Sequence, residues 1–309
     1  MAEEFTYTGI KKWKPTNDEW VDFYTSQKLP FQLLENEYLV VESEDESPQY
    51  YCYEHGKLRQ FRGGSIKTVK EQTPAEIFIT DLESRSNIAK NSKKTKEKKS
   101  SKGNQTIIYP RNEEQVCAFD MIKDSTKPIK LITGRWGSGK TMILVTAALE
   151  ALQLGKFDKI VWLRNNIDVK DTKDLGALPG EVIDKLLPFL GPFIDHAGEN
   201  SVRTMIQKGT LCVEPLQTIR GRNFKNTLIM CSEAENLTKE HIQLIIARAA
   251  EGSEVWLDGD NRQRDKVTFE KSRGLETLIE RLQGEELFGY VHLVKSERSK
   301  VAEMADLLD

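Results

Sequence analysis

The sequence feature that most constrains this chain is a phosphate-binding loop, Gly134-Arg135-Trp136-Gly137-Ser138-Gly139-Lys140-Thr141, which matches the pattern G-x-x-x-x-G-K-[ST] in full. A short apolar run, Ile129 to Thr133, precedes it, and a run with helical spacing, Met142 to Leu154, follows it. Gly155 then stands where a left-handed cap ends a helix. A strand, a glycine loop and a helix in this order direct backbone N–H groups and the positive end of the helix dipole at one spot. The segment therefore predicts a nucleoside triphosphate site, with a glycine-rich structural turn as the alternative.

Three side chains near this loop have expected roles in binding the nucleotide. Lys140 would reach the β- and γ-phosphates, and Thr141 would offer its hydroxyl to Mg²⁺. Gln115 stands at the start of a run with helical spacing upstream of the loop. A glutamine there can present its amide to the edge of adenine, as in the Q motif of helicases, although an exposed polar residue on a helix is an equal alternative. We therefore expect ATP and Mg²⁺ as cofactors.

A second candidate segment follows the apolar run Thr227 to Cys231 and reads Ser232-Glu233-Ala234-Glu235-Asn236. A carboxylate at the end of a strand next to the phosphate loop can orient and activate the attacking water, and we expect this role for Glu233. The residue before it is usually an aspartate that holds Mg²⁺ through water. Ser232 can accept a hydrogen bond from a metal-bound water but brings no charge, so weakened metal binding and hydrolysis are expected. The alternative is a polar strand end without catalysis.

A third segment, Asp258-Gly259-Asp260-Asn261-Arg262-Gln263, follows the next strand-like run and contains G-D-x-x-Q. In superfamily 1 helicases this motif places a glutamine near the γ-phosphate, so Gln263 is a candidate sensor of the triphosphate. Asp260 is hypothesised to compensate in part for the acid missing at Ser232.

Composition predicts an ordinary soluble protein, at 38% apolar and 30% charged residues over a length of 309. No run approaches the roughly 20 apolar residues that cross a bilayer, and the first residues lack the pattern of a signal peptide, so we expect no membrane contact and a cytoplasmic location. The four cysteines show no metal-ligand spacing and are expected to be reduced.

A lysine-rich run divides the chain. Residues 90–102 hold seven lysines and one glutamate, with no apolar side chain. We expect a small β-rich accessory module over 1–88, a solvated linker over 89–106 and a P-loop ATPase domain over 107–309. The linker serves either as a plain spacer or as a contact for nucleic-acid phosphates.

In the module, strands are expected at Tyr38 to Val41, Gln49 to Tyr53 and Leu58 to Phe61, with a turn at His55-Gly56-Lys57 and a helix within 74–84. Six of the eight tyrosines lie in the first 53 residues. We expect these aromatic side chains to form a core more often than a platform for stacking bases.

After the loop, strand-like apolar runs alternate with helical stretches, at Lys159 to Leu163, Leu211 to Glu214, Thr227 to Cys231, Glu254 to Leu257 and Tyr290 to Leu293. This alternation predicts an α/β fold with a mostly parallel sheet covered on both faces. Ligands of such sheets bind beyond the carboxyl ends of the strands, where the candidate residues collect.

Together these motifs resemble the PhoH family of P-loop ATPases, and above all the C-terminal part of fused PIN–PhoH proteins. The motifs that carry the resemblance are the phosphate loop, Gly-Ala-Leu-Pro-Gly-Glu (176–181), Arg220-Gly221-Arg222, Glu233-Ala234-x-Asn236-Leu237-Thr238, Gly259-Asp260-x-x-Gln263 and Glu297-Arg298-Ser299. The resemblance extends over residues 107–309 and, loosely, over 36–61. The departures are Ser232 for the usual aspartate and Glu235 for the usual glutamine. Residues 1–30 are too short for a PIN nuclease, so ribonuclease activity is not expected.

The resemblance implies a single RecA-like ATPase domain that acts on RNA or single-stranded nucleic acid and assembles as a homo-oligomeric ring such as a hexamer. Too little chain follows Gln263 for a second RecA-like domain, so an arginine facing the γ-phosphate is expected from this domain or from a neighbouring subunit. Arg298 is similar to the family's arginine near the nucleotide. Arg220, Arg222 and Arg248 are candidates for a finger across an interface, for phosphate contacts or for ordinary surface ion pairs.

The sequence is compatible with two functions from different classes. The first is an ATP-driven motor or remodeller of nucleic acid, of helicase type. The second is a nucleotide-gated nucleic-acid-binding scaffold in which hydrolysis is weak or lost, and Ser232 is the residue that discriminates between them.

Overall fold

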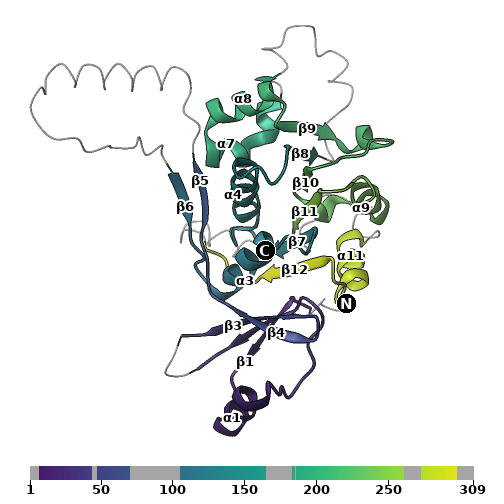
Figure 1. Cartoon of the computed structure of the whole chain (residues 1–309). Coiled ribbons are helices and arrows are strands. Elements are labelled where there is room, and N and C mark those ends of the chain that lie inside the picture. Colours follow the sequence, from purple (N-terminus) through teal and green to yellow (C-terminus); the bar gives the residue numbers. More distant parts are fainter. Residues whose placement is uncertain are drawn as a thin grey trace, which may run out of the picture.

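The computed structural model describes residues 7–43, 47–69, 105–164, 183–184, 186–260 and 273–297. Several expectations concern residues outside these ranges, namely Gln263, Arg298, the motif at 176–181, the helix within 74–84 and most of the lysine-rich linker. The described residues form a large α/β domain and a smaller β-rich module below it (Figure 1). No helix among them is long and apolar enough to span a membrane.

The domain is built on a parallel sheet of six strands in the order β12-β7-β11-β10-β8-β9. Its strands are β7 (Ile129–Gly134), β8 (Lys159–Arg164), β9 (Leu211–Pro215), β10 (Thr227–Cys231), β11 (Glu254–Gly259) and β12 (Phe288–Leu293). All six fall on runs that the sequence marks as strands, and this confirms the expected α/β fold with a parallel sheet. β11 lies between β7 and β10, so the strand that leads to Glu233 is not adjacent to the strand of the phosphate loop.

Alternation of side chains along the strands gives the sheet two buried faces. Ile132, Trp162 and Met230 point to one face, where they pack with helices α3, α4, α7 and α8. Leu131, Val161 and the other alternate residues point to the opposite face, where α9 and α11 lie. The bounds of these helices are α3 (Glu113–Lys123), α4 (Lys140–Gln153), α7 (Gly191–Ala197), α8 (Glu199–Lys208), α9 (Lys239–Ile246) and α11 (Gly274–Leu282), and short 3₁₀ turns occur at Leu187–Leu190, Leu216–Ile219 and Ala234–Asn236.

The N-terminal module is a four-stranded sheet in the order β1-β2-β3-β4 with one helix. Its elements are β1 (Ile10–Trp13), α1 (Asn17–Ser26), β2 (Tyr38–Val41), β3 (Gln49–Glu54) and β4 (Lys57–Phe61). The last three strands agree with the expected ones, whereas β1 and α1 were not expected. Thr16 caps α1 together with Glu19 in a capping box, a signal that the sequence does contain. The aromatic rings of Trp13, Phe23 and Tyr51 form the core of this module, as predicted for most of its aromatic residues.

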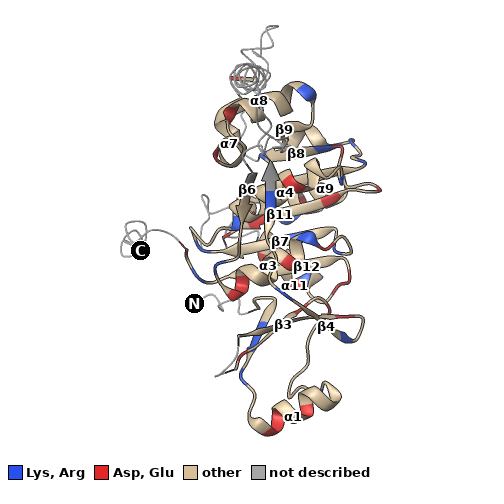
Figure 2. Ribbon diagram, turned by 60° about the vertical axis from the view of Figure 1, so that its left-hand side comes forward, with Lys and Arg blue, Asp and Glu red and all other residues tan. Residues whose placement is uncertain are grey.

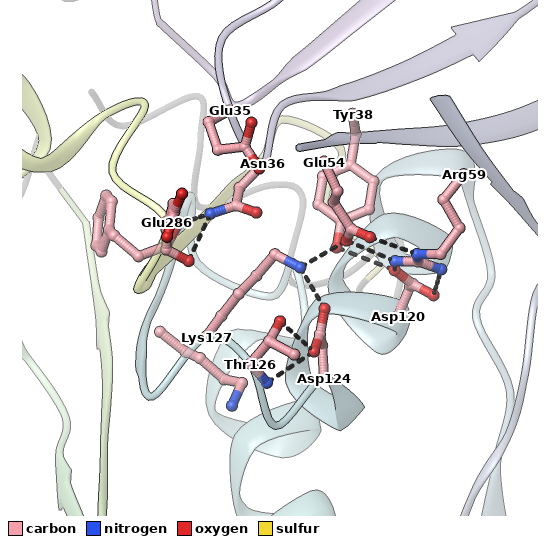
Figure 3. Close-up of polar contacts among 12 residues, drawn as sticks. Glu35, Asn36, Tyr38, Glu54, Arg59, Asp120, Asp124, Thr126, Lys127 and Glu286 are labelled. Carbon is pink, nitrogen blue, oxygen red and sulfur yellow. Dashed lines mark hydrogen bonds and ion pairs between the residues drawn. The ribbon is translucent and has the colours of Figure 1, made fainter. Parts of the chain in front are cut away.

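Polar side chains attach the module to the domain (Figure 3). Lys127, whose side chain has no solvent exposure, bonds Glu54 at 2.7 Å and also contacts Asp124. Arg59 of β4 donates to Asp120 of α3 at 2.8 Å. The amide nitrogen of Asn36 donates to three backbone carbonyl oxygens, of residues 285, 286 and 288, at 2.9 to 3.1 Å. The module is therefore fixed to α3 and to the start of β12 by directional contacts.

A two-stranded ribbon links the module to the domain around the undescribed residues 70–104. It pairs β5 (Ile66–Val69) with β6 (Gln105–Ile108) in antiparallel register, and β5 packs beside α4. Residues 105 and 106 thus belong to a strand, whereas the sequence analysis placed them in the linker. Their pairing with β5 supplies the backbone hydrogen bonds that a solvated linker would leave to water.

Candidate nucleotide-binding site

The phosphate loop leaves β7 and enters α4 in a conformation that only glycine allows at two points. Gly134 has φ +152°, and a Cβ there would lie 2.3 Å from the carbonyl oxygen of Leu293. Gly139 has φ +91°, and a Cβ there would lie 3.1 Å from Nε2 of Gln115. Close backbone approach and positive φ therefore explain these two glycines of the motif.

The start of α4 is open to an anion. Gly139 is the N-cap residue and supplies no side-chain hydrogen bond, so the first N–H groups of α4 lack a side-chain cap. Lys140, the first residue of α4, folds its ammonium group back over the loop and donates to the carbonyl oxygen of Arg135 at 3.1 Å. The helix dipole, the N–H groups and the Lys140 charge thus meet at one place, as phosphate binding requires.

Gln115 supports this loop from α3. Its side chain is 1% exposed, so the alternative of an exposed helix residue was wrong. Nε2 donates to the carbonyl oxygen of Ser138 at 2.9 Å, and Oε1 accepts from the backbone N–H of Arg111 at 2.9 Å. The structure therefore places Gln115 in contact with the phosphate loop, while its contact with adenine stays a prediction.

The segment after β12 lies against the outer side of the loop. The backbone N–H of Glu297 donates to the carbonyl oxygen of Gly137 at 2.9 Å, and the hydroxyl of Ser296 donates to that of Trp136 at 3.2 Å. Asn112, the N-cap of α3, donates to the carboxylate of Glu297 at 2.8 Å. The chain thus reaches the nucleotide site directly before Arg298, whose own position lies outside the described residues.

A pocket of about 560 Å³ opens at the carboxyl ends of the strands. It brings together Lys140, Thr141, Ser232 and Glu233, which the sequence analysis selected from two separate motifs. The remaining lining residues come from the loop, α4, α7, the ends of β8 and β11 and the turn after β10: Trp136, Gly137, Gly139, Met142, Arg164, Pro192, Asp195, His196, Glu235, Asp258, Gly259 and Asp260. Its position agrees with the rule that ligands of parallel sheets bind at this edge.

Glu233 is held in a strained backbone conformation at the mouth of this pocket. Its φ of +59° lies in the left-handed region, which a residue with a Cβ rarely adopts. Its N–H donates to Oδ1 of Asp258 at 3.2 Å, and its carboxylate lies 3.6 Å from Nη1 of Arg164. The side chain is 58% exposed, so the carboxylate can reach a water in the pocket.

Two acidic side chains behind Glu233 are buried. Asp258, at 2% exposure, uses Oδ1 for the bond to Glu233, whereas its Oδ2 is buried without a hydrogen-bond partner. Glu235 accepts from the backbone N–H of Asp260 at 3.0 Å. Burial, with the negative charge of Asp258 added, raises the pKa of Glu235 to about 7. The pocket therefore combines a cationic loop side with a partly desolvated acidic side.

The arginines differ in whether they line the pocket. Arg220, Arg222 and Arg248 do not line the pocket, and the guanidinium of Arg222 lies 4.8 Å above the ring of Phe224. Arg164, which sequence reasoning missed, does line it and pairs with Glu233. The signal that could have drawn attention to Arg164 is its place at the end of a parallel strand, and Asp258 likewise stands near the end of β11.

The donors at this pocket fit Mg²⁺ bound together with a nucleotide. Within the described ranges, no group of three or more His, Cys, Asp or Glu side chains is placed to hold a metal ion alone. Mg²⁺ typically uses one or two carboxylates and completes its shell with water and substrate phosphates. The hydroxyls of Thr141 and Ser232 and the unpartnered carboxylate oxygen of Asp258 supply oxygen donors of this kind.

Comparison with known proteins places this site in a family. Protein PhoH2 of Bacillus subtilis (strain 168) is 34% identical over 213 residues, which is 65% of this chain and 48% of that protein. Protein PhoH of Escherichia coli (strain K12) is 30% identical over 196 residues, which is 62% of this chain and 54% of that protein. The chain thus spans about half the length of the curated relatives it matches.

Among solved structures, this chain is similar to the flagellar accessory protein FlaH from Methanocaldococcus jannaschii, at 9% identity and a TM-score of 0.26. The match covers 50% of this chain and 72% of FlaH, and so low a score carries no structural conclusion. The family model described as PhoH-like protein matches residues 107–306, which include the phosphate loop, Gln115 and the strand ends that form the pocket. The chain therefore belongs to the PhoH-like protein family.

Proposed function

We propose that this chain binds ATP with Mg²⁺ and hydrolyses it. The observation that carries the proposal is the pocket in which Lys140 and Thr141 of the phosphate loop face Glu233 from a different strand. A site that only bound phosphate would need the loop but no carboxylate near it. The exposed carboxylate of Glu233, opposite the start of α4, adds the group that hydrolysis requires.

Each residue of the pocket has a distinct task in this proposal. The N–H groups at the start of α4 and the ammonium group of Lys140 bind the β- and γ-phosphates. Glu233 orients the attacking water and accepts its proton, and Arg164 keeps the Glu233 carboxylate in position until the γ-phosphate competes for its guanidinium. Mg²⁺, when bound with the nucleotide, would neutralise charge on the phosphate oxygens.

The proposal extends to RNA or single-stranded nucleic acid as the partner and to a homo-oligomeric ring, with remodelling or unwinding as the work done. Acidic and basic positions are interspersed over the described elements (Figure 2). The densest positive charge of the sequence is the run of seven lysines in residues 90–102. Such a run supports contact with phosphates. Arginines away from the pocket, such as Arg220, remain candidates for a finger toward a neighbouring subunit.

The test is steady-state ATP hydrolysis by the purified protein with Mg²⁺, with and without single-stranded RNA and DNA. Lys140→Ala serves as the blank, and Glu233→Gln tests the base. Hydrolysis that rises with nucleic acid and falls to the blank in both variants is the expected result. Turnover that persists in Lys140→Ala would overturn the proposed site.

Two observations favour a second function, a nucleotide-gated scaffold with little hydrolysis. Ser232 brings no charge to the metal side of the pocket, and the Glu233 carboxylate is engaged by Arg164. In that function, ATP would stabilise the assembly and its contact with nucleic acid. Tight ATP binding without turnover, together with a large gain of turnover in Ser232→Asp, would favour the scaffold over the motor.

A further inference from the structure

The carboxylate of Asp258 has one oxygen without a partner although it lies at the edge of the nucleotide pocket. The side chain is 2% exposed and Oδ1 accepts from the N–H of Glu233, but Oδ2 is buried without a hydrogen bond. Within the described residues, no cation forms an ion pair with it. A buried polar oxygen without a partner is unfavourable, so its presence points to a ligand that completes it.

The register of the sheet places this carboxylate beside Ser232. Cys231 of β10 pairs with Leu257 of β11, so Ser232 and Asp258 are the next residues at neighbouring strand ends. β11 is also the strand adjacent to β7, which leads into the phosphate loop. A carboxylate on β11 is therefore one strand nearer to the strand of the loop than Ser232 is.

From this geometry we propose that Asp258 supplies the acidic group for Mg²⁺ that Ser232 lacks, an inference that rests on the proposed function. When bound with the nucleotide, Mg²⁺ would be held by Oδ2 of Asp258, while Oδ1 keeps its bond to the N–H of Glu233. The same side chain thus links the metal to the backbone of the residue that orients the water.

The neighbouring acids are less suited to this task. Glu235 already accepts the backbone N–H of Asp260. Asp260, which the sequence analysis suggested as the compensating acid, is buried and has contacts of its own. Among the acids that line the pocket, Asp258 combines burial with a carboxylate oxygen that lacks a hydrogen bond.

The experiment measures metal binding rather than turnover. Calorimetric titration gives the dissociation constant of ADP with Mg²⁺ and with EDTA, and electron paramagnetic resonance counts Mn²⁺ bound in the presence of ADP. Asp258→Asn keeps an oxygen that can accept the Glu233 N–H but removes the charge. Asp158→Asn is the matched control, because Asp158 is exposed at the opposite end of the sheet and does not line the pocket.

We expect Asp258→Asn to weaken Mn²⁺ binding by roughly tenfold or more and to abolish the tightening of ADP binding by Mg²⁺. The dissociation constant of ADP measured with EDTA should be unchanged. The double variant Ser232→Asp with Asp258→Asn should restore Mn²⁺ binding. The melting temperature of Asp258→Asn without ligands should equal or exceed that of the wild type, because a buried charge is removed, and this measurement confirms that the variant folds.

Other outcomes separate the two proposals. Wild-type Mn²⁺ affinity in Asp258→Asn, with ADP binding intact, would overturn the role of Asp258 and leave the nucleotide site standing. A wild-type protein that binds neither ADP nor ATP more tightly than Lys140→Ala would overturn the proposed function, and the metal assignment with it.

Discussion

The side-chain amide of Gln115 donates a hydrogen bond to the backbone carbonyl oxygen of Ser138, in the middle of the phosphate loop, at 2.9 Å. The two groups are buried, and the other end of the same amide accepts from the N–H of Arg111. One side chain therefore fixes the loop to the turn that begins α3.

Replacing Gln115 with alanine should destabilise the protein and weaken nucleotide binding. The change leaves the buried carbonyl oxygen of Ser138 and the part-buried N–H of Arg111 without their partner, which costs about 2 kcal/mol in the free energy of unfolding. Urea denaturation and ADP titration measure the two effects. Gln243→Ala, on the exposed side of α9, is the matched control and should change neither. Unaltered stability in Gln115→Ala would contradict the structural role assigned to this amide.

Arg164→Gln should reduce the preference of the site for ATP over ADP. The guanidinium is expected to leave Glu233 for the γ-phosphate, a group that ADP lacks, so ATP affinity should fall by about tenfold while ADP affinity stays the same. Competition titrations with ADP and a non-hydrolysable ATP analogue measure this ratio. In Arg222→Gln, which removes an arginine paired with Glu214 outside the pocket, the ratio should be that of the wild type. Equal losses for both nucleotides in Arg164→Gln would exclude a sensor role.

Acid should detach the N-terminal module through the carboxylates around Lys127. Against the effect of burial, hydrogen bonds from Arg59 and Lys127 lower the pKa of Glu54 from 4.5 to about 2, and those from Lys127 and Thr126 lower the pKa of Asp124 from 3.8 to about 2. Because the folded pKa values lie below the unfolded ones, their stabilisation is complete above about pH 4.5 and is lost as the pH falls toward 2. Urea midpoints at a series of pH values measure this slope.

Lys127→Met tests the source of that slope. Removing the buried cation leaves the two carboxylates without their shared partner, so we expect a loss of about 3 kcal/mol near neutral pH and a flatter response to acid. A variant with the same slope as the wild type between pH 4.5 and 2 would show that other groups cause the acid sensitivity.

Asn36→Gly should weaken the attachment of the module at its second contact. Asn36 has φ +64°, which glycine adopts without strain, so the substitution removes the three amide hydrogen bonds and preserves the backbone. The expected loss is about 2 kcal/mol, with faster hydrogen exchange in β2. Exchange in β2 at the wild-type rate would indicate that the salt bridges alone hold the module.

The strands of the large sheet could be predicted from the sequence because each is a short apolar run, and the central ones are buried on both faces. Thr227–Cys231 agrees residue for residue, and β7 agrees to within one residue. The strand β1 could not be predicted in this way, because its residues Ile10 to Trp13 include two lysines and its partner β2 is distant in sequence. Pairing between distant segments leaves no local pattern.

The phosphate loop, Thr141 and Glu233 could be predicted because their spacing or strand-end position carries the chemistry. Asp258 and Arg164 share a strand-end position, but that position alone does not show their roles, because these depend on the order of the strands, which places β11 between β7 and β10. The burial of Gln115 depends in the same way on how α3 packs against the loop. Gln263 and Arg298 stay predictions.

The contact of Ser296 and Glu297 with the phosphate loop has a mechanical consequence. Their hydrogen bonds end on the carbonyl oxygens of Trp136 and Gly137, so this segment is joined to the loop directly and not only through the sheet. Under the proposed function, a partner that alters these two bonds would change the affinity of the loop for the nucleotide. By reciprocity, loading the loop with a triphosphate changes how firmly that end is held.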